Sequence, residues 1–134
     1  MRWTAIVALA LVTACGGPLK YKVASSAKAP GADATIVAAI DKAQNTTAVE
    51  VEATNLAPAA RVVPGTVGYV VWFRRNSNSP WQRLGTLAYE EGDRRGRLKV
   101  SAPETRFEVE ISCERELSPA SPSPEIVFAQ AIGE

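Results

Sequence analysis

The sequence predicts an all-β protein, an antiparallel β-sandwich of about seven to eight strands. Apolar and polar residues alternate in several segments, as in strands that bury one face and expose the other. Turns rich in Gly, Pro and Asn separate these segments at short intervals, and helical periodicity is weak throughout. Together these patterns favour short strands joined by tight connections.

The first clear strands are predicted at 19–23 and 47–54. Leu19, Tyr21 and Val23 alternate with lysines in the first, and valines alternate with glutamates in the second. Residues 55–65 contain Asn, Pro and Gly and are predicted to form a loop.

Residues 34–43 fit two structures. Ile36, Val37, Ala39 and Ile40 could form the apolar stripe of a short helix that begins near Asp33. The same segment could be a strand, with every second residue on one face. We favour the strand, because its neighbours are strands and because β-branched residues are common in it.

The middle of the chain carries its most apolar segment. Residues 66–73 are apolar on both predicted faces, which indicates a strand in the interior of a sheet. A polar turn at 74–80 leads to a strand predicted at 81–89, and the two strands are expected to form a hairpin.

Three further strands are predicted towards the C-terminus. A polar strand at 94–100 precedes the clearest pattern of the chain, in which Phe107, Val109, Ile111 and Cys113 alternate with polar residues. A loop with three prolines at 118–124 precedes the last strand, at 126–132.

The number and spacing of these strands indicate an immunoglobulin-like sandwich in the broad sense. The Cys…Trp…Cys arrangement of true immunoglobulin domains is missing, so the expectation concerns architecture only. A single domain is expected over residues 19–134, preceded by a signal peptide at 1–14 and a short tether at 15–18.

The N-terminus carries a second kind of signal. Arg2 precedes an apolar run of about eight residues, which suits a signal peptide and is too short to span a bilayer. Val12-Thr13-Ala14-Cys15 then ends the run, and this segment resembles the lipobox of bacterial lipoproteins. The usual first residue of that motif is Leu, so Val12 is a mild departure.

The lipobox resemblance implies cleavage before Cys15 and acyl chains on that residue, which would anchor the domain in a membrane. More than one chain is needed, because a single acyl chain gives only marginal binding. Gly16 follows the cysteine where, in that family, Asp retains lipoproteins in the inner membrane; the outer membrane is therefore expected in a two-membrane bacterium. The alternative is an ordinary secretory signal, with Cys15 as a plain thiol or disulfide partner.

Charge and composition exclude several functions. Fifteen Lys and Arg balance 14 Asp and Glu without long blocks of one sign, which argues against a nucleic-acid partner. Histidine is absent, which removes the commonest general base and metal ligand. Neither a metal-binding spacing nor a phosphate loop is present, and we expect no cofactor. If Cys15 is acylated, Cys113 is the only free thiol; its place in the pattern predicts burial and a monomer.

The C-terminal half has a second, looser resemblance. Tyr69-Val70-Val71-Trp72-Phe73, Trp81 with Leu84-Gly85-Thr86-Leu87, Phe107-Glu108-Val109-Glu110-Ile111, and Pro122-Ser123-Pro124 before Ile126-Val127-Phe128 are similar in layout to the extracytoplasmic sandwich domain of anti-sigma factors of the sigma-K regulator type. The resemblance covers residues 66–130 and implies a fold; no sigma-binding region or membrane-spanning helix accompanies it.

Two sets of side chains are candidates for a site. Glu108, Glu110, Glu114 and Glu116 form a carboxylate row, which we interpret as the solvated face of a strand. Across strands, this row is expected to pair with Arg94, Arg95, Arg97 and Arg106. Trp72 and Trp81 could line a groove for a partner, although such residues more often pack a core or cover a sheet face.

The sequence therefore favours a non-enzymatic, membrane-anchored lipoprotein of the cell envelope that acts as a binding or structural module. One alternative is an accessory regulatory subunit of an envelope signalling complex, from the anti-sigma resemblance. Another is a hydrolase that works without histidine, for which no Ser-x-x-Lys motif is present. A protein partner is expected for the first two, but the sequence does not identify it.

Overall fold

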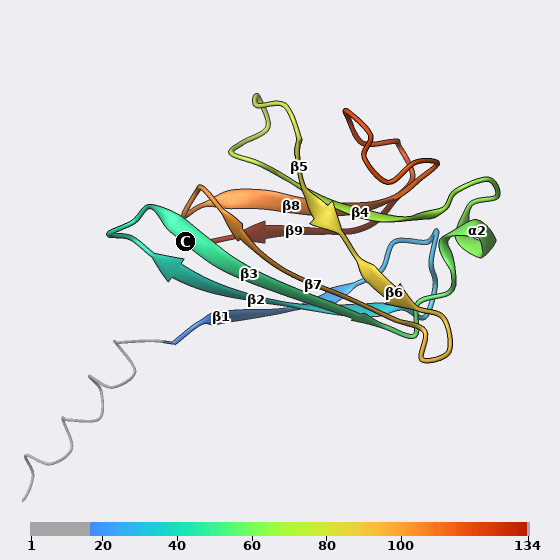
Figure 1. Ribbon diagram of the computed structural model, residues 1–134. Helices are drawn as coiled ribbons and strands as arrows, with labels where there is room; N and C mark the ends of the chain where they lie inside the picture. Colours follow the sequence, from blue (N-terminus) through green and yellow to red (C-terminus); the bar gives the residue numbers. More distant parts are fainter. Residues whose placement is uncertain (1–16, 134) are drawn as a thin grey trace, which may run out of the picture.

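The computed structural model describes residues 17–133. Within this range nine strands form two antiparallel sheets that lie face to face, as Figure 1 shows. The predicted β-sandwich is confirmed. The strands are β1 (Leu19–Ala24), β2 (Asp33–Asp41), β3 (Thr46–Thr54), β4 (Gly68–Arg74), β5 (Gln82–Thr86), β6 (Ala88–Glu90), β7 (Arg95–Ala102), β8 (Phe107–Glu114) and β9 (Ile126–Ile132).

The strand order is that of an immunoglobulin-like sandwich. One sheet has the order β1-β2-β3-β7-β6 and the other β5-β4-β8-β9. Strands β2, β3, β7 and β6 take the places of A, B, E and D in an immunoglobulin domain, and β4, β8 and β9 take those of C, F and G. Strand β1 is an addition at the edge of the five-stranded sheet.

The ambiguous segment at 34–43 forms a strand, β2, as far as Asp41, and Lys42 and Ala43 begin the turn to β3. All nine residues of β2 pair with β3, and β1 pairs with its other side. Ala34, Ile36 and Ala38 face the core and are buried, while the residues between them are more exposed. The left-handed backbone of Asn45 (φ 58°) turns the chain from β2 to β3.

The prediction of one continuous strand at 81–89 is wrong, because the chain passes from one sheet to the other within this segment. β5 pairs with β4, as the predicted hairpin requires, but β6 pairs with β7 in the opposite sheet. Between them Leu87 turns into the core, and its N–H donates to the carbonyl of Tyr69 at 2.9 Å. Gly96 leaves room for this turn, because a Cβ there would lie 3.0 Å from Leu87 Cδ1. The division explains why nine strands are present where about seven to eight were predicted.

The main core lies between the two sheets. The five-stranded sheet contributes small and β-branched side chains such as Ile36, Val49 and Val51, and the four-stranded sheet contributes larger ones such as Tyr69, Phe73 and Phe107. Phe73 and Phe107 meet edge to face, with ring centroids 6.2 Å apart.

The predicted loop at 55–65 contains one short helix, α2 (Ala59–Val62), and is held by two tyrosines. The hydroxyl of Tyr69 donates to the carbonyl of Ala57, and that of Tyr89 donates to the carbonyl of Leu56. Leu56, near the start of this loop, is fully buried and adds to the core. The loop is therefore fixed to both sheets, because Tyr69 lies on β4 and Tyr89 on β6.

Part of the outer face of the four-stranded sheet is also covered. Val70 and Trp72 point away from the main core but are fully buried, and Ser112 and Glu114 lie beside them on β8. The loop between β8 and β9 lies on this side of the sheet (Figure 1). Its Ser123 donates through its backbone N–H to Glu114 and through its hydroxyl to the carbonyl of Cys113. The loop closes a second, smaller core.

Cys113 lies on the inner face of β8, as its place in the sequence pattern predicted. It is fully buried, and burial raises the pKa of its thiol to about 12, with the carboxylates of Glu125 and Glu114 acting in the same direction. Very little thiolate is therefore present at neutral pH. We expect the folded protein to react slowly with a thiol reagent at Cys113 and the denatured protein to react fast. Stopped-flow labelling checks this, and fast labelling of the native state would show that Cys113 is exposed.

Candidate partner-binding groove

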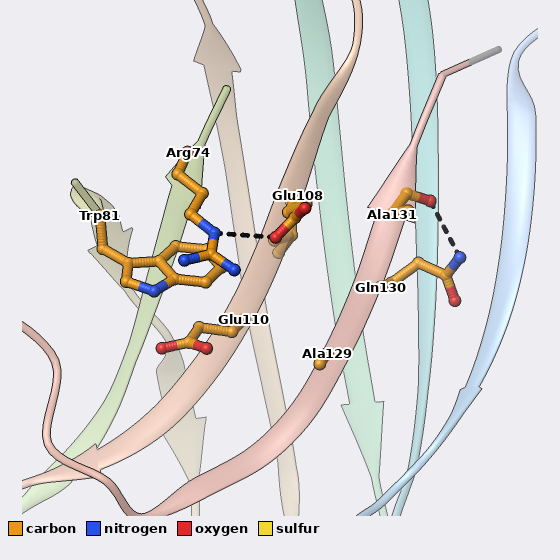
Figure 2. A pocket seen from close by; sticks show the side chains of 8 residues that line it. Arg74, Trp81, Glu108, Glu110, Ala129, Gln130 and Ala131 are labelled. Atoms are coloured by element: carbon orange, nitrogen blue, oxygen red, sulfur yellow. Dashed lines mark hydrogen bonds and ion pairs between the residues drawn. The ribbon is translucent and has the colours of Figure 1, made fainter. Parts of the chain in front are cut away.

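A shallow groove of about 310 Å³ lies on the outer face of the four-stranded sheet, where β8 and β9 run side by side. Figure 2 shows it from close by. The groove is lined by Arg74, Trp81, Glu108, Val109, Glu110, Ala129, Gln130 and Ala131.

Strand register places these residues in two rows across the sheet. Arg74 on β4, Glu108 on β8 and Ala131 on β9 lie opposite one another in the first row. In the second row Glu110 lies between the buried Trp72 and the exposed Ala129. Charged side chains on β8 therefore stand next to methyl groups on β9, and this difference in side-chain length forms the hollow.

One wall of the groove is a fixed assembly of three side chains. Arg74 Nε donates to Glu108 Oε1 at 2.8 Å, and the Arg74 guanidinium lies 4.3 Å from the centroid of the Trp81 ring. Figure 2 shows the guanidinium over the indole and its link to Glu108. A cation over an indole contributes about 0.5–1 kcal/mol at an exposed site. The contact holds Trp81 against the sheet, although Trp81 lies before β5 begins.

Glu110 has no such cationic partner. None of the ion pairs found among residues 17–133 includes it. Partial burial raises the pKa of its carboxyl, Arg74 lowers it, and the carboxylates of Glu108 and Glu114 raise it again. The groove therefore holds a carboxylate whose negative charge is only partly compensated.

The other wall is β9, an edge strand beyond which no further strand is paired within residues 17–133. Ala129 and Ala131 expose their methyl groups, and Gln130 turns to the other side of the strand, where its side-chain amide donates to the carbonyl of Ala131 at 2.9 Å (Figure 2). No residue of β9 carries a charge.

The two tryptophans that were candidates for a site lie in different environments in the structure. Trp81 is half-buried and lines the groove. Trp72 is fully buried, and its indole N–H donates to the Ser112 hydroxyl at 2.9 Å. The suggestion that Trp72 lies on a partner surface is wrong, because Trp72 is fully buried and packs a core. The loop between β8 and β9 crosses this part of the sheet, where the carbonyl of Leu117 accepts from Arg83, the residue opposite Trp72 on β5.

The four glutamates of the carboxylate row also differ in their burial. Glu108 and Glu110 are half-buried in the groove, and Glu116 is exposed beyond the end of β8. Glu114 is only 5 % exposed and accepts hydrogen bonds from Ser112 and Ser123, so the predicted solvated face is wrong at this position.

The predicted pairing of this row with arginines is wrong as well. Arg95 and Arg97 pair with Glu52 of β3, because β7 lies between β3 and β6 and does not neighbour β8. Arg94 and Arg106 form no ion pair with the row among the described residues. Arg74 is the partner of Glu108, and sequence reasoning did not name it.

Other expectations concern residues or groups beyond this groove. Cys15 lies outside the described residues. Within residues 17–133 there is no group of three or more potential metal ligands, and no helix is long and apolar enough to cross a membrane.

The fold and the groove define an immunoglobulin-like β-sandwich with an open strand edge beside a partly uncompensated carboxylate. Comparison of the chain with models of protein families, with curated proteins and with solved structures finds no match in any of the three.

Proposed function

We propose that the protein is a lipid-anchored lipoprotein of the bacterial cell envelope that binds a partner without catalysing a reaction. The observation that carries the anchoring is the sequence Val12-Thr13-Ala14-Cys15 after a short apolar run. Only three residues separate this cysteine from β1, which begins at Leu19. Such a short tether would hold the sandwich close to the membrane surface.

Binding is supported by the groove on the four-stranded sheet. The groove joins an aromatic side chain, a carboxylate without an ion-pair partner among the described residues, and an open strand edge. Strand edges and aromatic side chains are common elements of protein recognition. The chain contains no histidine, so a partner-binding role needs fewer assumptions than acid–base catalysis.

Replacing Cys15 by Ser is expected to release the protein from membranes or to leave it as an uncleaved precursor. Acyl chains attach through the cysteine sulfur, and each buried methylene contributes about 0.8 kcal/mol to membrane binding. Cell fractionation followed by detection of the protein measures the result.

The matched control is Cys113→Ala, which removes the other cysteine and should leave the membrane fraction unchanged. An equal membrane fraction for Cys15→Ser and the unaltered protein, with the same mobility on a gel, would contradict lipid anchoring.

A further inference from the structure

We propose that the open edge of β9 binds an extended peptide segment that carries lysine or arginine, which would pair with β9 as an additional strand. This inference deepens the proposed function, on which it rests, because it names the kind of partner. The segment would form backbone hydrogen bonds with β9, and its cationic side chain would lie across the groove towards Glu110.

Along this edge, β9 has backbone groups for which no hydrogen-bond partner is found among the described residues. The N–H of Gly133 points away from β8 and donates to the Tyr21 hydroxyl at 3.0 Å. Backbone groups of alternate residues in a strand point to the same edge, so those of Ala131 and Ala129 point outward too. Among the described residues, the carbonyl of Ala131 accepts one hydrogen bond, from the side-chain amide of Gln130 at 2.9 Å.

The other three sheet edges are protected in ways that β9 is not. Strand β1 carries Lys20 and Lys22, and β6 has only three residues. Strand β5 carries Arg83. Charge and shortness are two usual means of blocking strand addition. β9 has seven residues and no charge.

The ends of β9 limit the length of the segment. Ser26 donates its N–H to the carbonyl of Val127 at 2.8 Å, and Tyr21 accepts from Gly133 at the other end. Between these two contacts, no hydrogen bond is found within residues 17–133 to the outward N–H groups of Ala129 and Ala131 or to the carbonyl of Ala129. A short extended segment fits this opening.

The negative charge of Glu110 indicates that the bound segment carries a cationic side chain. Ala129 lies directly opposite Glu110 on β8. A residue opposite Ala129 on an added strand would be about 10 Å from the Glu110 Cα, because neighbouring strands are about 4.8 Å apart. An extended lysine or arginine together with the glutamate side chain spans this distance. The Ala129 methyl leaves space for the aliphatic stem, which packs on it while the charged end meets Glu110.

The test is isothermal titration of the full chain in detergent micelles with a synthetic hexapeptide in which valine and lysine alternate. A second hexapeptide has glutamate in place of lysine. We expect saturable binding of the lysine peptide, weaker binding as salt rises, and none of the glutamate peptide.

Two variants of the protein test the two contacts separately. Ala129→Pro removes an outward N–H without removing a hydrogen bond to β8, and proline is tolerated at such edge positions. Glu110→Gln removes the charge and keeps the shape. Each should weaken binding of the lysine peptide at least about tenfold, since a specific backbone or charge contact is lost. Glu116→Gln, an exposed glutamate outside the groove, should bind as the unaltered protein does.

Several results would overturn the proposal. They are absence of binding, equal binding of both peptides, or binding that neither Ala129→Pro nor Glu110→Gln weakens. Self-association that Ala129→Pro abolishes would also overturn it, because a second copy would then occupy the edge. If Ala129→Pro does not fold, the binding of the lysine peptide to Glu110→Gln alone tests the proposal. Failure here leaves the fractionation result for Cys15→Ser untouched, so this inference and lipid anchoring are tested separately.

Discussion

Replacing Val109 by Asp is expected to unfold the domain. Val109 is 1 % exposed and lies on the inner face of β8, which is bonded to β4 on one side and to β9 on the other. An ionised carboxylate there would have no partner in the apolar core, and its burial would cost several kcal/mol. The total stability of such a domain is about 5–15 kcal/mol, so one change of this kind removes most of it. Circular dichroism and urea denaturation measure the loss.

Ser101→Asp is the matched control for this prediction. Ser101 is exposed on β7 and lies opposite the exposed Ala48. The same new carboxylate would remain in water there, and its effect should stay below about 1 kcal/mol. Similar stability of the two variants would contradict the placement of the core between the sheets.

Replacing Trp72 by Ala is expected to destabilise the protein by about 3–5 kcal/mol, as for other buried aromatic residues. Trp72 is fully buried on the outer face of β4, and its indole N–H donates to Ser112. Ser112 in turn donates to Glu114, which also accepts the N–H of Ser123 from the covering loop. Truncation therefore opens a cavity and leaves part of a buried polar network without its donor.

Trp81→Ala is the control for Trp72→Ala. It tests whether the loss of stability comes from the buried position of Trp72 or from the removal of any tryptophan. Trp81 is half-buried and contacts Arg74 at the surface, so its removal should cost less than about 1 kcal/mol. Urea denaturation compares the two variants. If both lose the same stability, the second core beneath the β8–β9 loop is not present.

Strand positions could be read from the sequence because one face of most strands meets water and the other meets the core. The alternation in β3 and at the start of β8 follows from this difference, and so does the burial of Cys113. The same rule gives the wrong environment at Glu114, where a loop covers the face that would otherwise be wet. Periodicity within a strand holds no information about a distant segment that folds over it.

Strand order limited the other predictions. The change of sheet at Leu87 depends on which strands β5 and β6 meet, and those partners are remote in sequence. For the same reason Arg95 and Arg97 were assigned to the wrong carboxylates. The local sequence pattern predicts where the strands lie. Which faces and side chains of the strands contact each other depends on pairing between segments that are remote in the sequence.

The groove was only partly predictable. Trp81 was named as a candidate because aromatic residues stand out in a sequence, whereas Glu108 and Glu110 were interpreted as the solvated face of a strand. Arg74, Ala129 and Ala131 were missed, because their role follows from the order β4-β8-β9. One signal was present: the last strand, Ile126–Ile132, has no charged residue, which is unusual for a strand that lies at an edge.

The most direct test of the account is the mass of the N-terminal peptide of the protein isolated from membranes. Lipid anchoring predicts a peptide that begins at Cys15 and is heavier than its amino-acid sequence by the mass of the attached acyl groups. A peptide that begins at Met1, or one that contains an unmodified Cys15, would contradict the account.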